Sequence, residues 1–254
     1  MKKQIIKSIK KVMALVPFHR KYYCSICDHK VNYFLDFGST AEIFQNIKII
    51  GGGYREKVQC PICHSIDRMR WLDYVLDKKT DVYEDTQKTI LHIAPEKCIE
   101  KKIRKISNHS RYITGNIIEG AADEVVDITN MSYPDKYFDY IIVNHVLEHI
   151  ENEKRAMQEI HRTLKDTGKF IFSMPICENQ DTFEAEEKNL SEQERLRLYG
   201  QEDHVRLYGK DAKEHMEEYG FRIEEYRVNE CVSEKEIQRA RYISEDRIYL
   251  AQKS

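Results

Sequence analysis

Four cysteines have the type and spacing to bind a metal ion. They form two C-x-x-C pairs, Cys24 with Cys27 and Cys60 with Cys63, and 32 residues separate the pairs. Each pair can hold one ion from a tight turn, and two pairs complete a closed tetrahedral site of four thiolates. A single pair could serve redox chemistry instead. The doubled pattern predicts a structural Zn²⁺ bound by Cys24, Cys27, Cys60 and Cys63, with no open position for a reaction.

A second polar group follows residues 138–143, of which five are aromatic or β-branched. This run predicts a central parallel strand covered on both faces. Asn144 and His145 then lie at the carboxyl edge of the sheet, where open α/β sheets bind ligands. His145, Glu148 and His149 also share one helix face, so they could bind a divalent ion. The alternative is that Glu148 and His149 brace the start of the following helix.

Three shorter strands are expected over 89–94, 111–116 and 125–128, with a helix from 97 to about 107. The loop after the first strand, Pro95-Glu96, contains no glycine. A dinucleotide pyrophosphate needs the close backbone approach that glycine permits, so NAD and FAD are disfavoured. A nucleoside cofactor without phosphates, such as S-adenosylmethionine, does not impose that demand.

Residues 91–250 resemble class I S-adenosylmethionine-dependent methyltransferases, and are most similar to a bacterial group with a four-cysteine module upstream. The matching segments are Leu91-His92-Ile93-Ala94-Pro95-Glu96, Ala122-Asp123 through Thr129, Phe138-Asp139 through His149, Leu164 through Lys169, and Glu202 through Arg206. The resemblance implies an α/β, Rossmann-like fold with a seven-stranded, mostly parallel sheet and one antiparallel strand. Segments 221–228 and 247–251 alternate as the two closing strands should, and Thr167-Gly168 predicts a left-handed helix stop.

The resemblance also implies a cofactor site at the strand ends. Its expected residues are His92, Ala94, Pro95, Glu96, Asn116, Ile117, Asp127, Ile128, Asn144 and His145. Asn116 takes the place of the acid that usually binds the ribose hydroxyls, so we expect weaker binding of S-adenosylmethionine. Asp127 would accept from the adenine amino group, and His145 would lie beside the methyl group. Each could instead be a strand-end cap or a turn residue.

Residues 177–209 are expected to form an acceptor lid. Nine acids and three bases lie between 178 and 203, which repels phosphodiesters and favours a small or glycan-linked acceptor over RNA. His204 is the candidate general base, because two preceding acids could raise its proton affinity. A hydrogen bond that orders the lid is the alternative. Tyr199, Arg206 and Tyr208 are candidates to position the acceptor.

The chain divides into an amphipathic helix over 1–20, a zinc module with a linking helix over 21–77, and a catalytic domain over 78–254. The first 27 residues hold seven bases and no acid. Because the whole chain has a net charge of −2, residues 28–254 carry a net charge of −9. The basic helix could lie on an anionic membrane or dock on protein. No apolar run is long enough to span a bilayer, and we read no signal peptide, so a cytoplasmic location is expected.

These features predict methyl transfer from S-adenosylmethionine to a small-molecule or glycan-linked acceptor. Two alternatives stay open at this point. One is an RNA methyltransferase whose zinc module binds nucleic acid, and the other is a binding or scaffold protein without catalysis.

Overall fold

A computed structural model describes residues 21–84, 87–106, 111–187 and 189–254. The amphipathic helix predicted over 1–20 lies outside the described residues. Within them, no helix is both long and apolar enough to cross a membrane.

The core is a seven-stranded sheet in the order β13-β14-β10-β9-β6-β7-β8. All neighbouring pairs are parallel except those of β14, which runs antiparallel to both β10 and β13. The predicted mostly parallel sheet with one antiparallel strand is therefore confirmed. The strands are β6 (Ile90–Ile93), β7 (Tyr112–Asn116), β8 (Glu124–Val125), β9 (Phe138–Asn144), β10 (Leu164–Ser173), β13 (Phe221–Arg227) and β14 (Arg247–Lys253).

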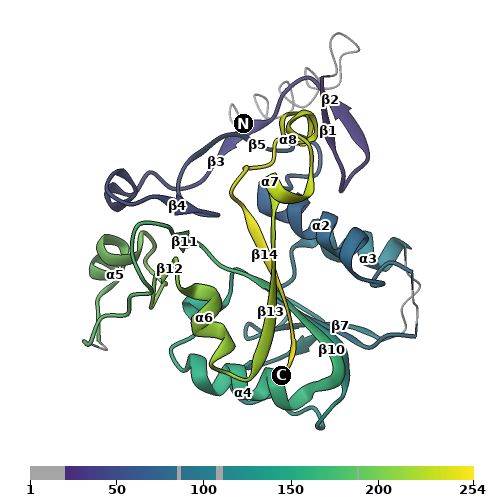
Figure 1. The fold of residues 1–254 in the computed structure, drawn as a ribbon, viewed down its shortest axis with the longest axis vertical. Coiled ribbons are helices and arrows are strands. Elements are labelled where there is room, and N and C mark those ends of the chain that lie inside the picture. The colour runs from purple at the N-terminus through teal and green to yellow at the C-terminus, as the bar shows by residue number, and fades with distance from the viewer. Residues whose placement is uncertain (1–20, 85–86, 107–110, 188) are drawn as a thin grey trace.

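Alternate residues of the central strands bury opposite faces of this sheet, as a strand's twofold side-chain period requires. Ile141 and Val143 pack with α4 (Glu153–Thr163) and α6 (Ala212–Glu217). Tyr140 and Ile142 pack with α2 (Asp67–Lys79), α3 (Lys97–Ile106), α7 (Val228–Cys231) and α8 (Glu234–Ala240). Figure 1 shows α4 and α6 at one end of the molecule and α2 and α3 on the other side of the strands. The central strands are thus covered on both faces, as their continuous apolar sequence predicts.

The predicted left-handed stop at Gly168 is wrong. Helix α4 begins after Asn152, whose side chain accepts from the backbone N–H of Arg155, and ends at Thr163. Leu164 is already extended and pairs with Phe138, so β10 starts there. Gly168 lies within β10 and outside the left-handed region, because the chain passes from helix to strand without the turn that a left-handed glycine makes.

The cysteine module, defined here as residues 21–66, is built from short strands. They are β1 (Tyr22–Cys24), β2 (His29–Val31), β3 (Leu35–Phe37), β4 (Ile49–Ile50) and β5 (Arg55–Gln59), with the 3₁₀ turn η1 (Glu42–Gln45). Strand β1 pairs with β2, and β3 pairs with β5. The buried guanidinium of Arg70 in α2 donates to carbonyls of Val58 and Ser65 on one side and of Ala240 and Arg241 on the other. These bonds fix the module to the end of α8.

The lid, residues 177–209, contains regular structure that the sequence pattern does not reveal. Strand β11 (Ile176–Cys177) lies between β4 of the cysteine module and β12 (Tyr208–Gly209) in a three-stranded sheet. Helix α5 (Glu192–Tyr199) comes between β11 and β12 in the sequence. Figure 1 shows β4, β11, β12 and α5 together on one side of the molecule. Module and lid are therefore joined by a shared three-stranded sheet.

Candidate functional site

The four paired cysteines converge on one point. Their sulfur atoms lie within 4.8 Å of one another, with 3.6 Å between Cys24 and Cys63 and 3.8 Å between Cys27 and Cys60. A tetrahedral ion with metal–sulfur bonds of about 2.3 Å separates its ligands by about 3.8 Å, so the spacing is compatible with zinc. Ser65 lies 3.3 Å from the sulfur of Cys24 and 3.1 Å from that of Cys63. Its hydroxyl can donate a hydrogen bond to a thiolate, and such bonds from residues that do not touch the metal orient the ligands of metal sites.

The loop after β6 turns on a residue in the left-handed conformation. Ala94 has φ of +46°, and its N–H donates to the carbonyl of Gly115 at 2.7 Å. Related loops use glycine for such a turn, and an alanine there costs on the order of 1 kcal/mol. This turn places Pro95 and Glu96 at the carboxyl edge of the sheet, where the sequence predicts the cofactor.

Glu96 is the centre of a buried polar chain at this edge. Its carboxylate accepts from the amide of Asn144, whose oxygen accepts from Ser173, and lies 3.3 Å from Nε2 of His92. Nδ1 of His92 is 2.9 Å from the hydroxyl of Tyr112. Burial acts to raise the pKa of Glu96, but the His92 ring and the Asn144 amide outweigh it and lower that pKa. The predicted residues His92, Glu96 and Asn144 are therefore brought together, with their side chains directed at each other.

The next two strands end in more open positions. The amide oxygen of Asn116 accepts from the N–H of Ile118, and Oδ1 of Asp127 accepts from the N–H and hydroxyl of Thr129. Ile117 is 65% exposed, and Asp127 is exposed, while Ile128 is buried. Since Asn116 pairs with Val125, Ile117 comes one residue and Asp127 two residues after this paired end. An apolar surface beside a carboxylate is suited to an adenine ring and its amino group.

His145 follows β9 and also adopts the left-handed conformation, with φ of +55°. Its ring is buried, and Nδ1 lies 3.2 Å from Oε1 of Glu148. Burial, reinforced by the positive charges of Arg68 and Arg55, lowers the pKa of His145 well below its usual value. Burial raises the pKa of Glu148 to about 8. The pair is therefore held largely in its neutral forms at pH 7.

Gly51 of the cysteine module and Arg68 of the following helix α2 also lie here, and sequence reasoning missed both as site residues. A Cβ added to Gly51 would meet Cε1 of His145 at 3.2 Å, and the carbonyl of Gly51 accepts from Arg68 at 2.9 Å. The charge of Arg68 acts on Glu96 and Glu148 as well as on His145. The glycine run at 51–53 indicates a turn in the sequence but not a contact with His145. No local pattern distinguishes Arg68 from the other polar residues of the linking helix.

His204 reaches the same region from the lid. It is 2% exposed, its ring lies edge-on to that of His149 at 4.7 Å, and the following N–H, of Val205, donates to the carbonyl of Glu148. Burial, followed by the charge of His149, lowers the pKa of His204 to about 4. The expectation that neighbouring acids raise its proton affinity is therefore wrong, because burial outweighs Asp203. Its role as a general base stays a prediction.

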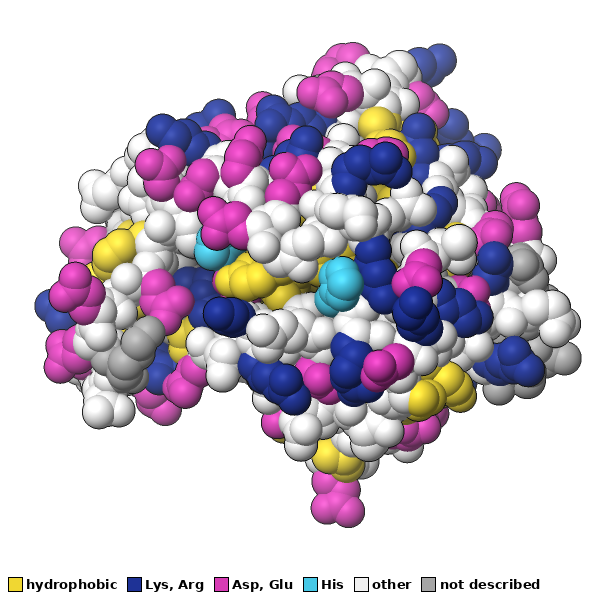
Figure 2. Space-filling view, turned by 60° about the horizontal axis from the view of Figure 1, so that its bottom comes forward, with side chains coloured by type: hydrophobic (Ala, Val, Ile, Leu, Met, Phe, Trp, Pro, Cys, Tyr) yellow, Lys and Arg dark blue, Asp and Glu magenta, His cyan; other side chains and the backbone are white. Residues whose placement is uncertain are grey.

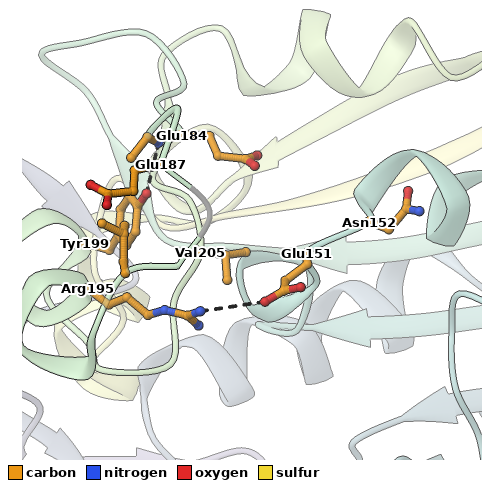
Figure 3. A pocket seen from close by; sticks show the side chains of 9 residues that line it. Glu151, Asn152, Glu184, Glu187, Arg195, Tyr199 and Val205 are labelled. Carbon is orange, nitrogen blue, oxygen red and sulfur yellow. Dashed lines mark hydrogen bonds and ion pairs between the residues drawn. The ribbon is translucent and has the colours of Figure 1, made fainter.

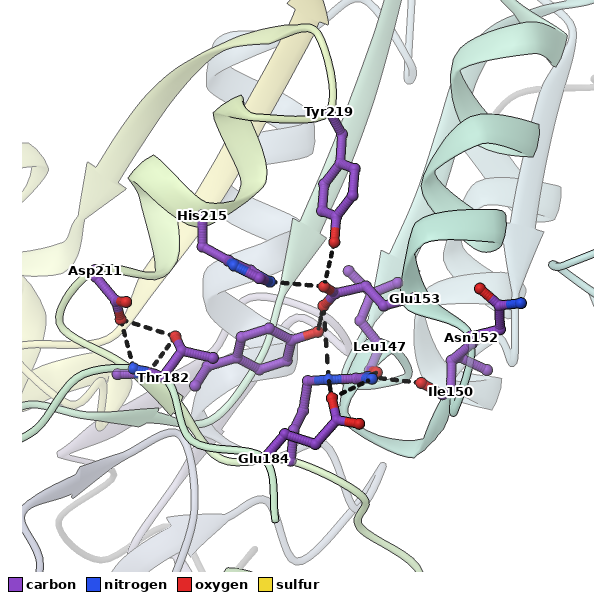
Figure 4. A network of polar contacts seen from close by, with 12 residues as sticks. Leu147, Ile150, Asn152, Glu153, Thr182, Glu184, Asp211, His215 and Tyr219 are labelled. Carbon is purple, nitrogen blue, oxygen red and sulfur yellow. Dashed lines mark hydrogen bonds and ion pairs between the residues drawn. The ribbon is translucent and has the colours of Figure 1, made fainter. Parts of the chain in front are cut away.

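Arg206 and Tyr208, predicted to position the acceptor, are buried in a structural network around Glu153 (Figure 4). Arg206 donates to the carbonyls of Leu147 and Ile150, and its Nε lies 3.8 Å from the Glu153 carboxylate. Tyr208 donates to the same carboxylate. These contacts occupy both side chains in this structure, and contact of either residue with an acceptor stays a prediction.

Two hollows border the lid. The lid pocket, of about 290 Å³, is lined by Tyr199, Glu184, Glu187 and Val205, and the ion pair of Arg195 with Glu151 crosses it (Figure 3). The module pocket, of about 530 Å³, is lined by Phe37, Phe44, Tyr54, Arg55, Arg68 and Gln201. Arg68 therefore contributes both to a hollow large enough for a small molecule and to the His145 cluster.

Comparison with known proteins agrees with this arrangement. A family described as a methyltransferase domain matches residues 24–226. A comparison with curated proteins finds no match.

Solved structures similar to the chain include an S-adenosylmethionine-dependent methyltransferase from Archaeoglobus fulgidus, at 14% identity and a TM-score of 0.43, covering 72% of this chain and 99% of that one. They also include a putative S-adenosylmethionine-dependent methyltransferase from Listeria monocytogenes, at 15% identity and a TM-score of 0.45, covering 71% and 97%. The family match spans most of the chain. The chain therefore belongs to the methyltransferase-domain family and is an S-adenosylmethionine-dependent methyltransferase.

Proposed function

We propose that this enzyme transfers a methyl group from S-adenosylmethionine to a small-molecule or glycan-linked acceptor bound in the module pocket. The observation that carries the proposal is the position of Arg68, which lines this pocket and donates to Gly51 beside His145. Nε of Arg68 is buried without a hydrogen-bond partner among the described residues. A buried donor without a partner is costly, so an oxygen of a bound acceptor would stabilise it.

The neighbouring arginine has no such spare capacity. Arg55 donates to both carboxylate oxygens of Asp67 and to the carbonyls of Gly52 and Gly53. It therefore supports the pocket wall. Phe37 and Tyr54, both exposed at the pocket, offer flat apolar faces of the kind that pack on sugar or aromatic rings.

The surface charge also favours this class of acceptor. Figure 2 shows acidic and basic side chains interspersed over one face of the molecule. The lid pocket is bordered by Glu151, Glu184 and Glu187 with Arg195. Carboxylates on this part of the lid repel a polyanion, so RNA is the less suitable acceptor.

The residues at the sheet edge have distinct tasks in the proposed reaction. The turn at Ala94 and the ends of β7 and β8 hold the cofactor, with Ile117 under the adenine and Asp127 at its amino group. The bound cofactor supplies an activated methyl group. His145 borders the path between the module pocket and the sheet edge, and the lid holds the acceptor in line and excludes water. The four cysteines hold a structural zinc ion that fixes the module wall.

A screen of acceptors by release of S-adenosylhomocysteine tests the proposal, with sugars, nucleotide sugars, phenols and RNA as separate sets. Arg68→Gln should raise the KM for the accepted compound at least tenfold and leave the Kd for S-adenosylmethionine within twofold. Lys78→Gln, an exposed position on the same helix, is the matched control. Turnover of RNA alone, or an unchanged KM in Arg68→Gln, would contradict the proposal.

The N-terminal helix as a membrane contact and a cytoplasmic location stay predictions.

A further inference from the structure

Three side chains at the junction of sheet edge and lid converge without a group that satisfies them. Ligand atoms of Glu148, His149 and His204 all lie within 4.8 Å of one another. Glu148 belongs to the 3₁₀ turn η2 (Leu147–His149) after β9, and His204 comes from the lid. The hydrogen bond from Val205 to the carbonyl of Glu148 holds the two segments together.

Two of the three side chains, Glu148 and His204, have buried polar atoms without a hydrogen-bond partner among the described residues. Neither ring nitrogen of His204 has a hydrogen-bond partner within the described part of the chain, and the same holds for Oε2 of Glu148. Both residues are only 2% exposed. Each buried polar atom without a partner costs on the order of 1 to 3 kcal/mol, so three in one place require a compensating contact.

Neighbouring side chains orient His149 and Glu148 in the way that hydrogen-bonding neighbours orient the ligands of a metal ion. Nδ1 of His149 lies 3.2 Å from the carboxylate of Asp203, which leaves Nε2 for a ligand. Oε1 of Glu148 lies 3.2 Å from the His145 ring, which leaves Oε2. A histidine that donates one nitrogen to a carboxylate and offers the other is the usual arrangement of a metal-bound imidazole.

We propose that Glu148, His149 and His204 form a second metal site, which binds a divalent transition-metal ion separately from the four cysteines. Two imidazoles and one carboxylate suit ions such as Zn²⁺, Mn²⁺ or Fe²⁺ and leave coordination positions open. The positive charge of Arg68 acts on Glu148 and His204 and opposes a bound cation, while the carboxylate of Asp203, 3.2 Å from His149, favours it. The affinity should therefore be moderate.

The site has a use if the proposed methyl transfer is right, although metal binding itself does not depend on it. An acceptor hydroxyl on an open coordination position would lose its proton more readily, because the cation stabilises the alkoxide. His204 would then be a metal ligand, and the ion would replace it as the source of activation.

The test is a Co²⁺ titration of the full chain after one equivalent of Zn²⁺ has been added, with no cofactor or acceptor present. Wild type should bind one Co²⁺, with weak visible bands and no sulfur-to-cobalt charge-transfer band, since such a band would report the cysteines. His204→Ala and Glu148→Gln should each weaken this binding at least tenfold. His161→Ala, a partly buried histidine beside Phe221, is the control and should bind as wild type does.

Circular dichroism of each variant shows whether it folds. If His204→Ala does not fold, Glu148→Gln decides, because it keeps the shape of the side chain. No Co²⁺ bound by Zn²⁺-loaded wild type, or wild-type affinity in Glu148→Gln, would overturn the second metal site. Because the readout is metal binding, failure of the proposed methyl acceptor would leave this result unaffected.

Discussion

Replacing Glu153 by glutamine should remove a large, pH-dependent part of the stability. The Glu153 carboxylate is buried and accepts from Tyr208, from Tyr219 at 2.7 Å and from Nε2 of His215 at 2.6 Å (Figure 4). Burial acts to raise the pKa of Glu153, but His215, Tyr208, Arg206 and Tyr219 outweigh it and lower that pKa from 4.5 to about 2.

The size of the effect follows from this pKa. A difference of about 2.5 between the unfolded and folded values, at about 1.4 kcal/mol each, gives about 3 kcal/mol of unfolding free energy. Because the folded pKa is depressed, this contribution is present above pH 4.5 and is lost as pH falls from 4.5 through 2. At pH 3 about 1 to 2 kcal/mol should remain.

The partner His215 sets the upper limit of the pH window. Its hydrogen bond with Glu153 raises the pKa of His215. A raised folded pKa gives stability that is present below the unfolded value of 6.5 and is lost as pH rises through the folded value. The destabilisation by Glu153→Gln should therefore be largest between about pH 4.5 and 6.5.

Urea unfolding of wild type and Glu153→Gln at pH 7, 6, 5, 4 and 3 measures this difference. Glu151→Gln is the control, because the Glu151 side chain is 78% exposed and its ion pair with Arg195 is long at 3.7 Å. That variant should change stability by less than about 0.5 kcal/mol at every pH. A Glu153→Gln difference below about 1 kcal/mol at pH 6, or one that does not shrink at pH 3, would refute the reasoning.

Three further substitutions test the zinc module and the sheet edge. Cys60→Ser should abolish the bound zinc, as seen by elemental analysis, and lower the melting temperature, whereas Cys231→Ser should change neither; retention of one zinc in Cys60→Ser would argue against the four-cysteine site. Asn116→Asp should tighten S-adenosylmethionine binding about tenfold in calorimetry, because a carboxylate forms charge-assisted bonds with ribose hydroxyls, and an unchanged Kd would place the ribose elsewhere. Ala94→Val should lower the unfolding free energy by more than about 1 kcal/mol. Ala94→Gly should change it by less than about 0.5 kcal/mol, because relief of the left-handed strain is offset by the larger unfolded-chain entropy of glycine; equal effects would show that the left-handed turn is not strained.

The sheet was predictable because its signals are local. Residues 89–94 and 138–143 are mostly apolar, and the polar residues Glu96 and Asn144 follow them, so both the parallel core and its polar carboxyl edge can be inferred from the sequence. The cysteine spacing likewise predicts a cluster, because each C-x-x-C pair brings its two sulfur atoms together locally and only one contact between the two turns is then needed. The prediction for Gly168 was wrong because a glycine after a helix can either end the helix in the left-handed conformation or lie in the next strand. The pairing of Leu164 with Phe138 starts β10 before Gly168 and places this glycine in the strand.

The site contacts that were missed depend on distant pairing. Gly51 reaches His145 because β4 pairs with β11, and no local pattern specifies that register. His204 has two acidic neighbours in sequence, yet the fold buries its ring against His149, and burial controls its pKa. Arg206 and Tyr208 are polar residues of the lid, and no local pattern shows that both contact the buried carboxylate of Glu153; their contact with an acceptor stays a prediction.

The order in which this chain leaves the ribosome matters for the three-stranded sheet of β4, β11 and β12. Ile50 can pair only after Ile176 has been synthesised, and Arg70 reaches one of its carbonyl partners, Ala240, only 170 residues later. Contacts so distant in sequence form slowly. If the four cysteines bind zinc as proposed, they would bind it before the rest of the chain is made, so translation should produce a metal-loaded amino-terminal module before the complete enzyme.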